Sequence, residues 1–228
     1  MPQPQHPGRA GAAGRPRDRQ IDGAVITATL EMLNEVGYSG LSLEKVAKRA
    51  GTSRPAIYRR WAGRAQLALA AIAARLDVPT PPDTGCTLCD IAESFNVFLI
   101  AYRTLRPDVL SALHADCSPD PELRERYLET VVEPSRRAVE RTLDRAVSRG
   151  DLRSDMDREL MLDLVGSLVH YRALLGRRHM SDEEAGAAIE TLLRGVAVDY
   201  PALVEHSRTL DREHLGDSGP HHVHPPRP

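Results

Sequence analysis

Apolar residues recur every three to four positions along most of the chain, which is the spacing of an amphipathic α-helix. From Asp18, a plausible N-cap, an apolar stripe runs through Ile21, Val25 and Met32, and Gly37 follows it as a helix-ending glycine would. No segment alternates apolar and polar residues with a period of two, so the pattern predicts no strand. The fold class expected from the chain is therefore all-α.

Two short helices follow the first one. Ser42 precedes an apolar pattern that ends at Gly51, and Ser53 is placed to cap the next helix. A turn of about three to four residues containing a glycine joins them, which is the arrangement of a helix-turn-helix. Ile57 and Trp61 are four residues apart in the second of these helices, so they share a face and can both be buried.

The remainder of the chain predicts a connecting helix and a larger helical part. Residues from about 64 to 76 are almost all Ala, Leu and Ile, so this helix should lie between two modules. After the proline-rich corner at 79–85, helical patterns continue, and Pro134 predicts a kink within a long helix that ends at Arg149. The expected organisation is a disordered basic arm (1–16), a helix-turn-helix domain (17–62), a connecting helix (63–78), a ligand-binding and dimerisation domain (84–200) and a flexible His- and Pro-rich tail (201–228).

Charge is distributed unevenly. Residues 1–75 carry 12 Lys or Arg against 5 Asp or Glu, and residues 76–228 carry 18 against 27, which together give the net charge of −2. A basic first third points to nucleic acid as its partner. An odd number of cysteines, the absence of a signal-peptide pattern and a longest apolar run of only eight residues (67–74) lead us to expect a cytoplasmic protein without a membrane segment.

The stretch AGTSRPAIYRRW (50–61) carries the chemistry expected of a DNA-reading helix. Its outward positions are cationic, and residues 51–75 contain no acid. The Arg54 guanidinium, at the leading end of the helix, matches guanine O6 and N7, although it could instead hold a phosphate. Pro55 and Ala56 could touch a thymine methyl group, or could simply start the helix.

The run GYSGLSLEKVAKRAGTSRPAIYRRWAGRAQL resembles the N-terminal helix-turn-helix of TetR-family transcriptional repressors. The resemblance implies an all-helical homodimer with three helices for DNA, a connecting fourth, and about five more for ligand and dimer contacts. It also makes Tyr58 the family's phosphate-contacting tyrosine. Two departures are Gly63, where relatives often have a Ser or Asn cap, and Arg64, where Lys is usual. The expected DNA contacts are Arg15, Arg17, Ser42, Thr52, Ser53, Arg54, Pro55, Ala56, Tyr58, Arg59 and Arg64.

Within this set, the residues play different expected roles. The hydroxyls of Ser42, Thr52 and Ser53 suit phosphates. Arg15 and Arg17 belong to an extended basic segment that could enter a minor groove, or could be a solubilising tail.

The larger helical part is expected to bind a small organic effector. Its candidate contacts are aromatic and polar tips: Phe98, Tyr102, His114, Tyr127, His170 and Tyr171. The alternative is a metal- or thiol-redox-responsive repressor that uses Cys86, Cys89, His114 and Cys117, although cysteines three apart on a helix are more often packing residues. We expect no cofactor, no bound metal and no enzymatic activity, because no phosphate loop, nucleophile elbow or HExxH motif occurs.

The sequence thus predicts a dimeric, sequence-specific regulator, a repressor that an effector releases from a pseudo-palindromic operator in double-stranded DNA. The last two expected helices, 157–175 and 181–196, carry apolar stripes that one subunit would leave partly exposed. Gly166 and Ala173 would permit close helix approach across a two-fold, four-helix interface.

Overall fold

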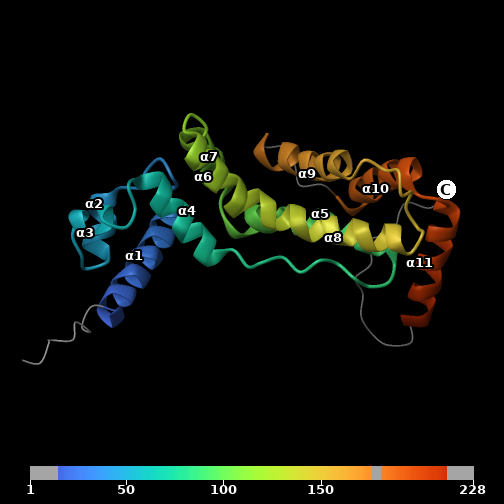
Figure 1. The fold of residues 1–228 in the computed structure, drawn as a ribbon, viewed down its shortest axis with the longest axis horizontal. Helices are drawn as coiled ribbons and strands as arrows, with labels where there is room; N and C mark the ends of the chain where they lie inside the picture. The colour runs from blue at the N-terminus through green and yellow to red at the C-terminus, as the bar shows by residue number, and fades with distance from the viewer. Residues whose placement is uncertain (1–14, 176–180, 215–228) are drawn as a thin grey trace, which may run out of the picture.

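The computed structural model describes residues 15–175 and 181–214, which form an elongated body of helices (Figure 1). The all-α expectation is confirmed: the described ranges contain no strand, and extended backbone pairs only at an isolated bridge between Leu152 and Ala197. No helix within them is long and apolar enough to cross a membrane. The expected disordered segment 1–14 and the His-rich segment 215–228 lie outside the described residues.

The N-terminal part begins earlier as helix than the sequence indicated. It comprises α1 (Arg15–Val36), α2 (Leu43–Arg49), α3 (Arg54–Tyr58) and the connecting helix α4 (Arg64–Arg75). The backbone of Arg15 and Arg17 therefore belongs to α1, which corrects the expectation that this basic segment is extended.

The larger part is a bundle of seven described α-helices and one π-helical turn. These are α5 (Thr87–Thr104), α6 (Pro107–Cys117), α7 (Pro121–Tyr127), the π-turn η1 (Leu128–Val132), α8 (Glu133–Ser148), α9 (Arg158–Leu174), α10 (Asp182–Val196) and α11 (Tyr200–His214). The kink predicted at Pro134 appears as the π-helical turn η1, which lies directly before the first turn of α8 where Pro134 stands. Proline has no N–H, so it cannot donate the hydrogen bond that would continue a regular α-helix there.

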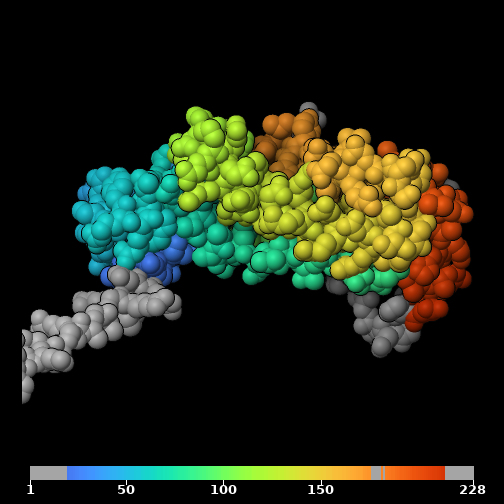
Figure 2. All heavy atoms as spheres, viewed as in Figure 1, coloured from blue at the N-terminus to red at the C-terminus, as the bar shows by residue number. Residues whose placement is uncertain are grey.

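Helix α11 corrects the expectation of a flexible tail from residue 201. Leu203 and Ser207 are buried, and α11 packs against α5 across the end of the bundle, as Figure 2 shows. Tertiary burial of one face thus stabilises a segment whose Pro- and His-rich surroundings suggested fraying.

Two clusters of buried side chains divide the core. The first joins α1–α4 with α6, α7 and the near end of α5, and the second fills the space among α5, α8, α9 and α10. Helix α4 belongs to the first cluster and packs against α1, α6, α7 and η1. It is therefore the element through which a movement of the larger part would reach the helix-turn-helix.

Candidate nucleic-acid interface

The turn between α2 and α3 is fixed by backbone hydrogen bonds. Gly51 has a φ of +63°, a left-handed conformation that residues with a Cβ rarely adopt. The Gly51 N–H donates to Lys48 O (3.3 Å) and the Thr52 N–H donates to Ala47 O (2.9 Å), which together close α2 with a Schellman motif. Ser53 then caps α3 as expected, because its Oγ accepts from the Ala56 N–H at 3.4 Å.

The inner face of α3 holds the helix against the core of the DNA-binding part. Ile57 is buried and Trp61 packs against the same cluster, as their spacing predicted. Ala56 is also buried, so its methyl group faces the core rather than solvent. This corrects the expected thymine contact for Ala56, whereas the neighbouring Pro55 is exposed.

The outer face of α3 presents Arg54, Tyr58 and Arg59, all of which are exposed. The Arg54 Nη2 donates to Tyr58 Oη at 3.3 Å, and the Arg54 Cζ lies 5.6 Å from the centroid of the Tyr58 ring. The hydrogen bond to Tyr58 raises the pKa of Arg54. The hydrogen bond and the ring contact together position the guanidinium on the surface. Tyr58 is 45% exposed, so its ring is only partly packed against the protein.

The two consecutive arginines after Tyr58 point to different partners. Arg60 forms an ion pair with Asp22 of α1 and donates from Nη1 to Ala56 O at 3.3 Å, so it fastens α3 to α1. Arg59, in contrast, is exposed.

Helix α2 supplies further groups to the same surface. Ser42 starts α2 without a capping hydrogen bond from its side chain, so its half-buried hydroxyl is available to a phosphate. Lys45 and Lys48 are exposed on α2, and sequence reasoning did not single them out. Their spacing of three residues, opposite the buried Val46, was the signal that could have identified them.

Arg64 takes part in a contact between helices rather than in an open cationic surface. Its Nη2 lies 3.2 Å from Asp116 Oδ2 of α6, and its Cζ stands 4.5 Å over the Tyr38 ring. The Tyr38 hydroxyl donates to the same Asp116 oxygen at 2.5 Å. This corrects the expected role of Arg64 at DNA, because its charge is already paired; we call these three side chains the α4–α6 link.

The pKa values of the α4–α6 link follow from this geometry. Burial raises the pKa of Tyr38, and its hydrogen bond to Asp116 raises it further. The pKa of Asp116 is lowered, chiefly by the Tyr38 hydrogen bond and then by the Arg64 guanidinium. The link therefore contains a carboxylate that stays ionised at neutral pH.

The candidate effector residues fall into a group of three rings, a pair of rings and one residue apart from both. The His170 ring contacts Tyr102 (centroids 5.3 Å apart) and Phe98 (6.3 Å), and the His114 ring lies 5.0 Å from Tyr127. Phe98 and His170 line a cavity of about 360 Å³. Burial raises the pKa of Tyr102 to about 12, so its hydroxyl stays protonated. Tyr171 is 51% exposed and lies outside both groups.

The cysteines do not converge on a metal site. Cys86 caps α5 and accepts from the Cys89 N–H at 3.3 Å, but Cys117 is buried in the other core cluster and His114 is exposed. The described residues contain no group of three or more His, Cys, Asp or Glu that could hold a metal ion. The four-residue metal alternative is therefore wrong, because helices α5 and α6 place its members in different parts of the core.

Gly166 has a different role from the one expected of it. A Cβ added to Gly166 would lie 3.2 Å from Phe98 Cε1, so the glycine permits α9 to approach α5 within one subunit. It is buried and does not contribute to an outer, dimer-forming face.

Comparisons with known proteins agree with this architecture. Residues 25–79 match the family described as bacterial regulatory proteins, tetR family, and residues 81–192 match the tetracyclin repressor-like C-terminal domain. The chain is 26% identical over 184 residues to the uncharacterized HTH-type transcriptional regulator YdeS of Bacillus subtilis (strain 168), which covers 80% of this chain and 93% of that one. It is 29% identical over 156 residues to the DNA-binding transcriptional repressor TetR of Mycobacteroides abscessus, with coverage of 67% and 82%.

A solved structure supports the same assignment. The crystal structure of the TetR family transcription regulator SCO0332 covers 78% of this chain and 98% of its own, with a TM-score of 0.60 and 26% identity. These relatives regulate transcription rather than catalyse reactions, which confirms that no enzyme is to be expected here. The chain belongs to the TetR family of DNA-binding transcriptional regulators.

Proposed function

We propose that this protein is a homodimeric repressor that binds a pseudo-palindromic operator and is released from it by a small organic effector. The observation that carries the proposal is the outer face of α3, where Arg54, Tyr58 and Arg59 are exposed within a stretch (51–75) that has no acid to neutralise them. A face of this kind suits the negative phosphates and guanine edges of a major groove.

The DNA contacts divide by chemistry. Arg54 reads a guanine edge, since it stands at the N-terminal end of α3 and the Tyr58 hydroxyl steadies its guanidinium. Phosphates are held by Tyr58, Arg59 and the hydroxyls of Ser42, Thr52 and Ser53, and Pro55 can touch a base methyl group. Arg15 and Arg17 belong to the first turn of α1, and we propose that they contact the DNA that flanks each half-site.

An exposed apolar face supports assembly with a second copy. Five apolar side chains are each between 44% and 62% exposed: Leu160, Leu164, Tyr171 and Leu174 on α9, and Leu175 directly after its end. Large apolar side chains gathered on one helix are costly to leave in water. A two-fold pairing through α9 and α10 would cover them and would set the two α3 helices at the spacing of two operator half-sites.

Effector binding would act through the contact between α6 and α4. The Phe98, Tyr102 and His170 rings meet between α5 and α9, and His114 and Tyr127 meet between α6 and α7. Asp116 of α6 holds both Arg64 at the start of α4 and Tyr38 of the DNA-binding part. A ligand that displaces α6 would therefore pull on α4 and α1 together.

The test starts with selection of bound sequences from a random DNA pool, followed by a screen of organic compounds on the selected operator. We expect inverted half-sites about one helical turn apart, roughly 34–36 Å, bound by two subunits. The effector found should bind less tightly when operator is present, by the same factor by which it weakens operator binding. Selection of a single, unrepeated half-site, or equal effector affinities with and without operator, would overturn the proposal.

A further inference from the structure

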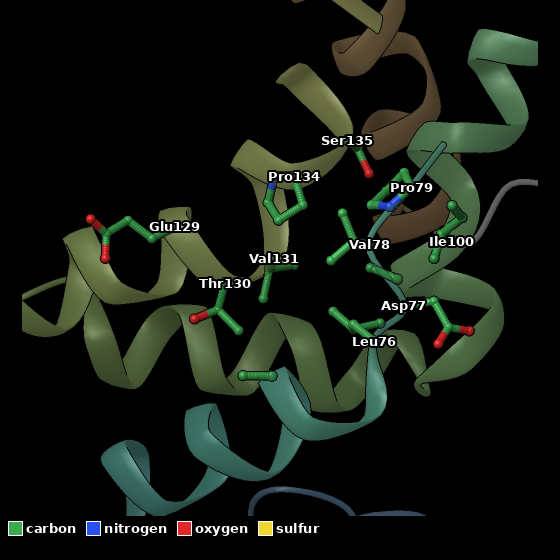
Figure 3. Close-up of a pocket in the computed structure, with 12 residues that line it drawn as sticks. Leu76, Asp77, Val78, Pro79, Ile100, Glu129, Thr130, Val131, Pro134 and Ser135 are labelled. Carbon is green, nitrogen blue, oxygen red and sulfur yellow. The ribbon is translucent and has the colours of Figure 1, made fainter. Parts of the chain in front are cut away.

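A cavity of about 330 Å³ lies where the connecting helix α4 ends, and no candidate contact named above lines it. Figure 3 shows Leu76, Val78 and Val131 gathered around this space, which is bounded by the end of α4, the segment after it, α5, and the η1–α8 junction. Pro79 and Pro134 complete an apolar wall. The volume and lining suit the body of a small organic molecule.

The charged groups at this cavity all have the same sign. Asp77 and Glu129 line it, and Figure 3 shows them on opposite sides, both exposed and with their carboxylates directed outward from the rim of the space. Neither a lysine nor an arginine is among the described residues that line it, since Arg75 in the last turn of α4 is exposed and does not contribute to the wall. A ligand whose charged group lies at the rim of the cavity would thus have a carboxylate near it and no cation among the lining residues.

The end of α4 adds to the negative potential. The last helical hydrogen bond of α4 runs from the Leu76 N–H to Ile72 O, at 2.9 Å, and Ala73 and Leu76 both line the cavity. The final carbonyls of a helix lack helical donors and carry the negative end of its dipole. The dipole and the two carboxylates therefore favour the same kind of ligand.

We propose that this cavity binds an organic cation with an apolar body, such as an aryl-alkyl ammonium compound, with its ammonium at the rim beside Asp77 or Glu129. The ligand would touch the last turn of α4 directly, whereas the ring groups described above contact α5, α6, α7 and α9. The inference that this ligand regulates DNA binding through α4 rests on the proposed function, whereas binding of the ligand to the cavity does not.

The test uses three probes that share one body and differ in charge: phenylbutylamine, phenylbutanol and phenylbutanoate. Each is titrated calorimetrically into the purified full chain at neutral pH, without DNA. We expect the amine to bind about tenfold more tightly than the alcohol, and the carboxylate to bind most weakly, because the nearby charges are all negative. Equal affinities for the three probes, or no binding of the amine, would overturn the proposal.

Variants locate the binding to this cavity. The double change Asp77→Asn with Glu129→Gln should remove most of the preference for the amine over the alcohol, leaving only the contribution of the helix dipole, and should not affect the alcohol. Both side chains are exposed, so the fold should survive. Ala73→Leu, also at an exposed position, should weaken all three probes by filling the space. Glu213→Gln, on α11, removes one exposed charge elsewhere and should change nothing.

Two further outcomes separate this proposal from the preceding one. An amine preference that is undiminished in the double variant, or probe binding that Ala73→Leu leaves intact, would place the cation elsewhere and defeat the inference. A chain that shows the expected charge order but fails to select an operator would defeat the repressor proposal alone.

Discussion

At the scale of single residues, the surface of α3 depends on which side chains the core leaves free. Arg54 and Tyr58 are exposed and hydrogen-bonded to each other, whereas Ala56 between them is buried. Arg60 is drawn to Asp22, so that it serves the fold while Arg59 serves the surface. A helix of five residues can thus divide its side chains between holding its own position and meeting a partner.

Substituting Arg54 tests base reading. Arg54→Ala should cost about 1–3 kcal/mol on the selected operator and should relax the preference at one base pair in each half-site, because a bidentate guanine contact is lost. Fluorescence anisotropy with operator and with unrelated DNA measures both affinities. Tyr58→Phe is the comparison, since loss of a phosphate contact should weaken both DNAs alike. An equal loss on both DNAs for Arg54→Ala would assign Arg54 to a phosphate.

The Cys86 thiol should lose its proton at a lower pH than an ordinary cysteine thiol. A hydrogen bond from the Cys89 side chain lowers the pKa of Cys86 to about 6, and the Cys89 backbone N–H assists, while burial opposes the shift. Because this pKa lies below the usual thiol value of 9.0, the thiolate's contribution to stability is absent below pH 6, grows as the pH rises from 6 to 9 and is complete above 9.

Ultraviolet absorbance of the thiolate measures this titration. A transition near pH 6 should appear in the native chain and should vanish in Cys86→Ser. Cys117→Ser is the matched control, because burial raises the pKa of Cys117 to about 11 and its removal should leave the transition in place. A transition that survives in Cys86→Ser would show that another group titrates.

At the scale of elements, α4 joins the two halves of the molecule both by packing and by charge. Its apolar face belongs to the core cluster shared with α1 and α6, and Arg64 at its start meets Asp116. Its other end borders the cavity lined by Asp77 and Val131. A ligand that binds near either end of α4 would therefore act on the same helix of twelve residues.

Removing one hydroxyl from the α4–α6 link should have a stability cost that depends on pH. Tyr38→Phe should lower the free energy of unfolding at pH 7 by about 0.5–1.5 kcal/mol, the usual value of one hydrogen bond. The Tyr38 hydrogen bond lowers the pKa of Asp116 below the usual value of 3.8, so the contribution of this bond to stability is present above that pH and is lost as the pH falls through the lowered pKa.

Denaturant unfolding at several pH values provides the measurement. Tyr127→Phe is a suitable control, because Tyr127 is also buried but its hydroxyl donates to a backbone carbonyl, that of Leu110, at 3.4 Å. Its stability cost should not change as Asp116 titrates. A cost for Tyr38→Phe that is the same at pH 7 and in acid would mean that the ionised carboxylate is not the partner that matters.

At the scale of the whole molecule, a basic end and an apolar side face point to two different partners. Helices α2 and α3, which carry the cationic surface, lie at one end of the elongated body, and α9, which carries the exposed leucines, lies on the bundle at a distance from them (Figure 1). DNA and a second subunit can therefore bind at the same time without competing for the same surface.

A charge placed on the α9 face should prevent pairing of subunits. Leu164→Lys should give a monomer at micromolar concentration by light scattering, because Leu164, 45% exposed in one chain, would become buried between two. Operator affinity should fall as the two half-sites are no longer bound by one dimer. Val36→Lys, at a similarly exposed apolar position in the DNA-binding part (49%), should leave the mass unchanged. A native chain that is monomeric yet binds operator tightly would contradict this prediction.

Local signals in the sequence determined most of the helices and the turn that positions α3. Gly51, Ser53 and the spacing of Ile57 and Trp61 act within a few residues of one another, so a glycine conformation, a cap and a buried face can be read directly from the chain. The apolar connecting helix α4 and the irregularity next to Pro134 can also be recognised from the sequence, because both depend on local composition.

Only the tertiary structure decided which outward groups already have partners. Arg64 meets Asp116 across 52 residues and Tyr38 meets it across 78, so no local pattern could reveal that the arginine is occupied. Helix α11 becomes ordered by packing on α5, and the cysteines separate because α5 and α6 enter different core clusters. Hydrogen bonds within a turn depend on neighbouring residues, whereas ion pairs and buried faces depend on which helices the fold brings together.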